Sequence, residues 1–133
     1  MDIKQLTQRA LKNRDKAYAP YSGFKVGAAL VTSDGEIYDG ANIENSSYGL
    51  TICAERVAAA KAVTDGKHSF SAIAVACDDK GFCRPCGACR QFLAEFSPEM
   101  EIIMVNASGE WESNSLAKLL PFSFSLEGGK KNV

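Results

Sequence analysis

Residues 71–77 read SAIAVAC, and this stretch decides the fold. Its apolar residues lack the polar alternation of a strand with one face in water, so we expect a strand buried on both faces. Residues 101–106 form a second such strand. Helical patterns at residues 53–63 and 87–96 are interleaved with these strands, which predicts helices on both faces of one sheet. The expected fold class is α/β, a three-layer α-β-α sandwich around a mixed five-stranded sheet.

The flanking segments supply the other elements. Asp2 can cap an N-terminal helix, with Gln5 completing a capping box, and the apolar stripe of this helix continues to about Tyr18. Residues 42–50 are polar and are expected to form a loop. The remaining strands and a last short helix are expected at residues 24–32, 36–43, 110–114 and 116–120. Because the chain shows no internal repeat and no long linker, we expect one domain over residues 1–133.

Composition and charge restrict the class of protein. The 133 residues are 46% hydrophobic and 23% charged, with a formal net charge of −1, as in an ordinary globular domain. Nucleic-acid-binding domains usually carry a basic excess, so no nucleic acid polymer is expected as a partner. No apolar run approaches the roughly 18 residues that cross a bilayer, and the N-terminus lacks the apolar core of a signal peptide. We therefore expect a cytoplasmic protein without a membrane partner.

The cysteines point to a metal site rather than to disulfides. The chain has five cysteines and one histidine, and cysteines of a cytoplasmic protein are more often metal ligands or buried thiols. Cys86 and Cys89 form a CxxC pair where one helix is expected to begin, and Cys53 stands where another begins. A catalytic zinc takes three protein ligands and leaves its fourth position to water. The spacing predicts zinc bound by Cys53, Cys86 and Cys89.

Two neighbours of Cys53 fit this chemistry. Glu55 stands in the first turn of the expected helix, where a carboxylate can approach the fourth metal position without being a ligand. Such a carboxylate can take a proton from a water and deliver it to a substrate nitrogen. Arg56 follows Cys53 by three residues and shares its helix face, so it can donate hydrogen bonds to the thiolate sulfur. We expect Glu55 to move the protons and Arg56 to offset the negative charge of the three thiolates.

The sequence alone leaves three other kinds of cysteine site as alternatives. Cys83 and Cys86 form a second, overlapping CxxC, so a closed structural zinc site that also uses Cys83 is an alternative. An iron–sulfur cluster and a thioredoxin-like redox pair are further alternatives. Cys77 ends a strand, where we expect a buried thiol. His68 follows the helix-ending Gly66 and is expected to be a surface residue without a role.

Four motifs in order carry a resemblance to a known family. They are YAPYSGFKVGAAL at 18–30, NIENSSY at 42–48, CAER at 53–56 and PCGACRQ at 85–91. With these motifs, nearly the whole chain resembles the small homotetrameric zinc-dependent cytidine deaminases. The resemblance implies one zinc per subunit on Cys53, Cys86 and Cys89, and Glu55 as proton shuttle. It implies hydrolysis of cytidine and 2′-deoxycytidine to uridine and 2′-deoxyuridine plus ammonia, a reaction of pyrimidine salvage.

The resemblance also assigns the substrate contacts. It implies that base and ribose are bound by Phe24, Asn42, Glu44, Ala54 and the backbone carbonyl of Arg84. Asn42 and Glu44 alternate around Ile43, so both can face one pocket while Ile43 turns to the core.

The family shares its active sites between subunits. Tyr48 and Phe124 match positions that complete a neighbour's site, which places the tail 121–133 at a subunit interface. The alternative is that Phe122 and Phe124 pack on their own subunit.

Two residues depart from the family pattern. Arg84 stands where a small or uncharged residue is expected, and its charge near the site would favour phosphorylated substrates. Cys83 is the other departure, and it could be oxidised or bind a second metal.

Two other functions compete with cytidine deamination. One rival function is deamination of another aminated base, in a nucleoside antibiotic or in RNA. The other is a zinc-stabilised interaction module without catalysis, which would have no use for Glu55 beside an open metal position.

Overall fold

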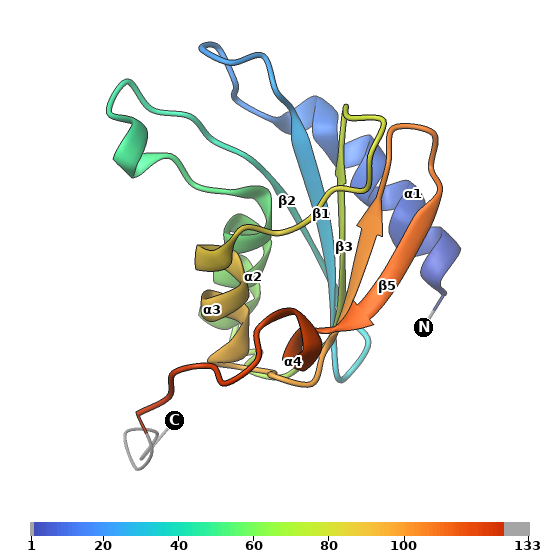
Figure 1. Ribbon diagram of the computed structural model, residues 1–133, viewed down its shortest axis with the longest axis vertical. Coiled ribbons are helices and arrows are strands. Elements are labelled where there is room, and N and C mark those ends of the chain that lie inside the picture. The colour runs from blue at the N-terminus through green and yellow to red at the C-terminus, as the bar shows by residue number, and fades with distance from the viewer. Residues whose placement is uncertain (1, 127–133) are drawn as a thin grey trace.

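The computed structural model describes residues 2–126 and is built around one five-stranded sheet (Figure 1). The strands run in the order β2-β1-β3-β4-β5. Their bounds are β1 Val26–Thr32, β2 Ile37–Ala41, β3 Phe70–Cys77, β4 Glu101–Val105 and β5 Trp111–Ser115. β3 and β4 are parallel, and the other neighbouring pairs are antiparallel. The sheet is therefore mixed and five-stranded, as the sequence predicts.

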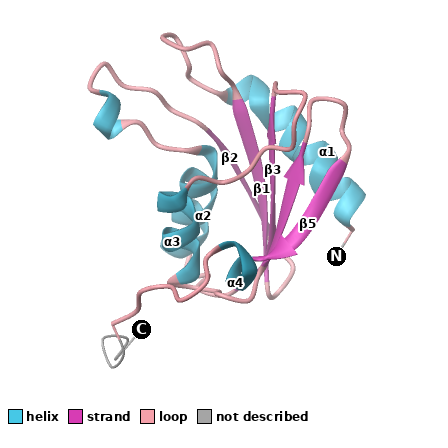
Figure 2. Ribbon diagram, viewed as in Figure 1, coloured by secondary structure: helices cyan, strands magenta, loops and turns pink. Residues whose placement is uncertain are grey.

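Helices cover both faces of this sheet (Figure 2). α1 lies on one face, and the other three helices lie on the opposite face. The helices are α1 Ile3–Asn13, α2 Ala54–Thr64, α3 Gly87–Ala94 and α4 Leu116–Leu119. Two short 3₁₀ helices are found at Arg14–Lys16 and Tyr48–Leu50. The predicted three-layer sandwich is confirmed.

β3 is the central strand and is buried on both faces. Its alanines Ala72, Ala74 and Ala76 pack with Leu6 and Ala10 of α1 in one apolar cluster. Its residues Ile73, Val75 and Cys77 belong to a second cluster, which also contains α2, Leu93 of α3 and Leu116 of α4. The continuous apolar run SAIAVAC therefore reflects two cores, one on each side of the same strand.

The first helix ends earlier than the sequence predicts. Asp2 caps it as expected, because its Oδ1 accepts a hydrogen bond from Gln5 N at 3.2 Å. α1 ends at Asn13, however, and not near Tyr18. Tyr18 N donates to Asn42 O at 2.9 Å, and Tyr18 O accepts from Glu44 N at 2.8 Å. This bridge to a distant segment requires an extended backbone, which a helix continuing to Tyr18 could not supply.

The segment after β2 is more ordered than the predicted loop. Ile43 bridges both Tyr18 and Ile52, and Tyr48–Leu50 form a 3₁₀ helix. The expectation that Ile43 turns to the core is wrong, because Ile43 is 44% exposed while Asn42 is 8% exposed. The polar residue is the one that turns inward, since the backbone offers it hydrogen-bond partners. Within residues 2–126, no helix has the length and apolar character needed to span a membrane.

Candidate metal centre and active site

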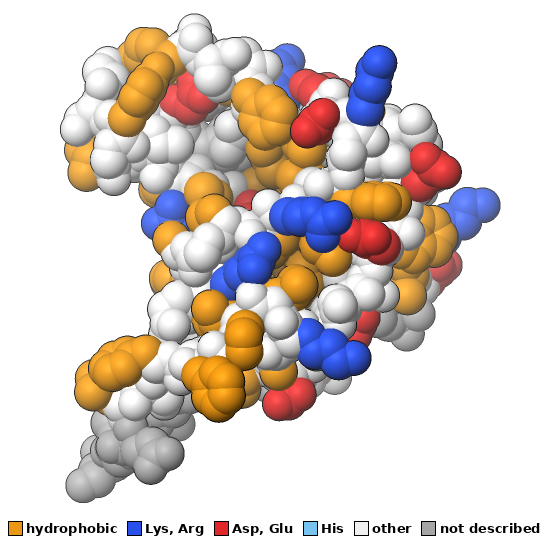
Figure 3. Space-filling view, viewed as in Figure 1, with side chains coloured by type: hydrophobic (Ala, Val, Ile, Leu, Met, Phe, Trp, Pro, Cys, Tyr) orange, Lys and Arg blue, Asp and Glu red, His pale blue; other side chains and the backbone are white. Residues whose placement is uncertain are grey.

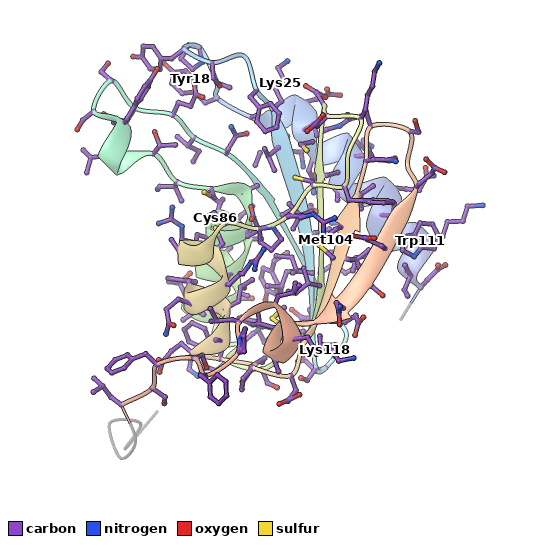
Figure 4. All side chains as sticks on the ribbon, viewed as in Figure 1. Tyr18, Lys25, Cys86, Met104, Trp111 and Lys118 are labelled. Atoms are coloured by element: carbon purple, nitrogen blue, oxygen red, sulfur yellow. The ribbon has the colours of Figure 1, made fainter. Side chains whose placement is uncertain are left out.

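Two helix starts place the three predicted cysteine ligands. Cys53 is the N-cap residue of α2, and Cys86 is the N-cap residue of α3. Cys89 lies in the first turn of α3, so its side chain returns to the side of Cys86. Figure 4 shows Cys86 at the first turn of α3, and in Figure 3 this side of the molecule is hollowed between two projecting segments.

A close approach of two elements sets the position of Cys53. A Cβ atom built on Gly40 of β2 would lie 2.3 Å from the carbonyl oxygen of Ala54 and 2.7 Å from Ala58 N. Only glycine lets the first turn of α2 lie this close to the sheet. The sequence does contain a signal for this contact, because an isolated glycine in a strand pattern marks a close backbone approach.

The three sulfur atoms fit a metal ion. Cys53 Sγ lies 4.0 Å from Cys86 Sγ, Cys86 Sγ lies 3.4 Å from Cys89 Sγ, and all three lie within 4.8 Å of one another. Tetrahedral zinc with Zn–S bonds of about 2.3 Å separates its sulfur ligands by about 3.8 Å. Cys89 is buried and Cys86 is exposed, so one side of the three-cysteine group faces the protein interior and the other side faces solvent. The three predicted ligands thus lie together as a group that could hold a metal ion.

Cys83 does not belong to this group. In the part of the chain that the structure describes, the metal-ligating cluster contains Cys53, Cys86 and Cys89 and no fourth cysteine, histidine or carboxylate. Cys83 is buried in the apolar cluster with Cys77, and burial raises the pKa of its thiol. This geometry disfavours the closed four-cysteine site, and it leaves the fourth metal position without a protein ligand. Cys77 is a buried thiol, as predicted.

Arg56 contacts the first ligand. Its Nη2 donates to Cys53 Sγ at 3.6 Å, while its Nε is buried without a hydrogen-bond partner among the described residues. The pKa of Cys53 is lowered to about 5, first by a hydrogen bond from Cys89 and then by Arg56. The same hydrogen bond raises the pKa of Cys89. The guanidinium thus favours thiolates at this site.

The Glu55 residue is almost completely buried. The residue is 4% exposed, although it lies in the first turn of α2 beside Cys53. Burial raises the pKa of its carboxyl group, a backbone hydrogen bond opposes this, and the negative charge of Cys53 adds to it, so that the pKa is about 7. A carboxyl group with a pKa near the working pH can both accept and donate a proton.

Asn42 and Glu44 both hold the segment that precedes β1. Asn42 Nδ2 donates to Phe24 O at 2.8 Å, and its Oδ1 accepts from Val26 N at 2.9 Å. Glu44 accepts from Tyr21 N at 3.0 Å, from Ser22 N at 3.1 Å and from the Ser22 hydroxyl. Nothing in the sequence indicates these partners, which are distant along the chain. Each side chain retains acceptor lone pairs, and Asn42 also retains one N–H for a ligand.

The aromatic residues expected near the site are exposed. Phe24 is 46% exposed, Tyr48 70% and Phe124 69%. Tyr48 packs edge-on against Tyr21, with ring centroids 6.2 Å apart. Phe122 is fully exposed and Phe124 is mostly exposed, so neither ring is buried in its own subunit.

Three other predicted positions are placed by the structure. The Arg84 guanidinium forms an ion pair with Glu112 of β5, with Nη1 to Oε1 at 3.0 Å, so its charge has a partner on the chain. His68 is exposed, as expected, with its ring centroid 6.4 Å from that of Phe96. Ala54 is buried at the start of α2. The tail residues 127–133 lie outside the described residues.

Comparisons with known proteins agree with this geometry. Residues 1–105 match the family model described as the cytidine and deoxycytidylate deaminase zinc-binding region. The chain is 52% identical over 128 residues to a cytidine deaminase of Sporosarcina psychrophila, covering 96% of this chain and 94% of the relative. It is 47% identical to one of Halalkalibacterium halodurans, covering 96% of this chain and 97% of the relative.

A crystal structure of cytidine deaminase from Burkholderia pseudomallei superimposes with a TM-score of 0.90. It is 47% identical to this chain and covers 93% of this chain and 100% of its own. The family match spans the three-cysteine group, and the relatives match from end to end. The chain therefore belongs to the cytidine and deoxycytidylate deaminase family, whose zinc-binding region contains Cys53, Cys86 and Cys89.

Proposed function

We propose that this protein hydrolyses cytidine and 2′-deoxycytidine to uridine and 2′-deoxyuridine, with release of ammonia. The observation that supports this most is the buried carboxyl group of Glu55, with a pKa raised to about 7, beside a three-cysteine group that has no fourth protein ligand among residues 2–126. A structural zinc site has no use for either feature. The names of the relatives, which are cytidine deaminases, support the choice of substrate.

In the proposed reaction, Cys53, Cys86 and Cys89 would hold one zinc ion per subunit. When bound, zinc would supply Lewis-acid chemistry that lowers the pKa of a water molecule toward about 7. Glu55 accepts a proton from this water as its oxygen attacks C4 of the pyrimidine, and gives the proton to ring N3. Glu55 then passes a second proton from the new hydroxyl group to the departing amine. One water is consumed and one ammonia released, and the carboxylate returns to its initial state.

The remaining residues would bind and orient the nucleoside. We infer base and ribose contacts for Phe24, Asn42, Glu44 and Ala54, and a contact of the substrate amine with the Arg84 backbone carbonyl. The ion pair of Arg84 with Glu112 favours an uncharged nucleoside over a nucleotide, because the guanidinium already has an anionic partner.

Assembly is the last part of the proposal. We infer a homotetramer of single-domain subunits in which Tyr48 and Phe124 of each subunit complete a neighbour's site. Its support is the exposure of these aromatic rings, since water-exposed apolar patches usually mark contacts with another protein. We infer a role in pyrimidine salvage from the proposed substrates alone, and the cytoplasmic location stays a prediction.

Purified protein tests the function directly. We expect zinc bound at one ion per chain and a loss of cytidine absorbance on mixing, with uridine and ammonia released in equal amounts. CMP and a cytidine-containing RNA oligonucleotide serve as counter-substrates and should react much more slowly. A protein that is fully loaded with zinc and does not deaminate cytidine or deoxycytidine would contradict the proposal.

A further inference from the structure

Arg90 binds three carbonyl groups around the turn that leads into the metal site. Its backbone N donates to Cys86 O at 3.0 Å, and its side-chain Nε donates to Pro85 O at 2.9 Å. Its Nη1 donates to Leu119 O, the last residue of α4, at 2.8 Å. Arg90 therefore bonds the carbonyl of Pro85 and that of the metal ligand Cys86. Its guanidinium also bonds the end of α4.

These contacts restrain the backbone between Arg84 and Cys86. The proline ring fixes φ of Pro85, and the hydrogen bond from Arg90 fixes the direction of its carbonyl. At the other end, Cys83 N donates to Val105 O of β4 at 3.1 Å. The Arg84–Pro85 peptide is therefore anchored on both sides, to β4 and to α3. Charge-assisted hydrogen bonds from arginine are stronger than neutral ones, which suits a carbonyl that must not reorient.

The same helix also holds the C-terminal segment. Arg side chains can bond the free carbonyls at the end of a helix, as Arg90 does for α4. The next residue, Gln91, donates from Nε2 to Phe124 O at 3.0 Å. α3 thus connects the turn before Cys86 with the segment that carries Phe124.

We propose that Arg90 is a positioning residue for the reaction. It holds the Pro85 carbonyl and, because φ of Pro85 is fixed, the Arg84–Pro85 peptide as well, so that the Arg84 carbonyl keeps its direction toward the substrate amine, and it ties this turn to the end of α4. The inference rests on the proposed function, because it uses the substrate contact assigned there to Arg84. Arg90 itself need not touch the substrate.

The test compares Arg90→Met with Arg14→Met in the zinc-loaded protein. Arg14 serves as the control: it is also partly buried, donates to the Leu11 carbonyl at 2.9 Å and to the Cys77 carbonyl at 3.4 Å, and forms an ion pair with Asp78 at 2.8 Å, and none of these partners lies in the turn at residues 84–86. We expect Arg90→Met to keep its zinc and lower kcat/KM for cytidine by about 10-fold or more, because small misplacements of binding groups cost that much. Arg90→Lys, which can reach one carbonyl, should recover part of the loss. Arg14→Met should keep wild-type kinetics.

Deuterium exchange supplies a readout that does not depend on activity. Amides of residues 83–89 should exchange faster in Arg90→Met and Arg90→Lys than in Arg14→Met. A lower melting temperature with unchanged kcat/KM and unchanged exchange would overturn the proposal, since Arg90 would then have only a structural role. If Arg90→Met does not fold, Arg90→Lys decides by the same two measurements. A wild-type enzyme inactive on cytidine would refute the proposed function instead, and the exchange data would still show whether Arg90 holds the turn.

Discussion

Glu55 combines two properties that rarely occur together in a carboxyl group: it is 4% exposed, and it lies within one helical turn of a metal ligand. If it moves the protons, Glu55→Gln should keep zinc and fold but lose about 10²–10⁴-fold in kcat, the usual contribution of general acid–base catalysis. Zinc analysis and steady-state kinetics on the same preparation check this. Near-normal turnover by the variant would remove Glu55 from the proposed role.

The pKa of Glu55 also predicts a pH dependence of stability in the metal-free protein. Its folded-state pKa is raised to about 7 from 4.5, so the folded state binds the proton more tightly. The resulting stabilisation is complete below pH 4.5 and is lost as the pH rises through 7. At about 1.4 kcal/mol per pH unit, this amounts to about 3 kcal/mol.

Urea denaturation with a chelator present measures this contribution. Between pH 4.5 and pH 8, the wild-type protein should lose stability relative to Glu55→Gln, in which residue 55 does not titrate. The cysteines titrate in both proteins, so taking the difference removes most of their effect. Parallel pH profiles for the two proteins would show that the Glu55 carboxyl is not perturbed by burial.

Cys89 is the buried ligand, and its replacement tests the three-cysteine site. Cys89→Ala should release the metal, because two thiolates remain, and should lose activity with it. Zinc content after dialysis measures the first effect. A zinc-replete, active variant would indicate that Cys83 replaces the missing ligand, and Cys83→Ala on its own should leave the zinc content unchanged.

At the scale of secondary structure, the sheet and its two helical layers could be predicted from the sequence. The run SAIAVAC and the Ala-rich segment after Cys53 each carry a local signal that tertiary contacts reinforce. The end of α1 could not be predicted, because Tyr18 leaves the helix to bridge Ile43. The spacing of the cysteines was enough to predict the three metal ligands. The hydrogen-bond partners of Asn42 and Glu44 could not be predicted, because they are backbone groups of a segment about twenty residues earlier in the chain.

Gly40 tests how an element contact positions the site. In Gly40→Ala, the added Cβ would meet the backbone of α2 at 2.3 Å, so α2 must move away from β2. Overpacking of this kind costs about 1–3 kcal/mol. We expect that loss in urea denaturation of the metal-free protein, together with weaker zinc binding because Cys53 moves with α2. Gly49→Ala is the control, because nothing lies within 4 Å of its added Cβ. Equal stability of the two variants would contradict this account.

Two segments of the subunit each expose several aromatic side chains. Tyr18, Tyr21, Phe24 and Tyr48 are each 46% exposed or more, and Phe122 and Phe124 in the C-terminal segment are exposed as well. Figure 3 shows apolar side chains on both segments that border the hollow. A monomer would leave this apolar surface in water. A neighbouring subunit that inserts one of these segments into the hollow would cover it and complete the active site.

Mixing two inactive variants tests whether subunits share their sites. Glu55→Gln removes the proton shuttle of its own subunit, whereas Phe124→Ala would remove a group that serves a neighbour. Each pure variant should have low activity. After subunit exchange at equal concentrations, a site can combine Glu55 from one variant with Phe124 from the other, and random assortment restores about a quarter of wild-type activity. If Phe124 served its own subunit, no mixed site would contain both residues. Mixing would then restore nothing, and that result, with subunit exchange verified by native mass spectrometry, would exclude shared sites.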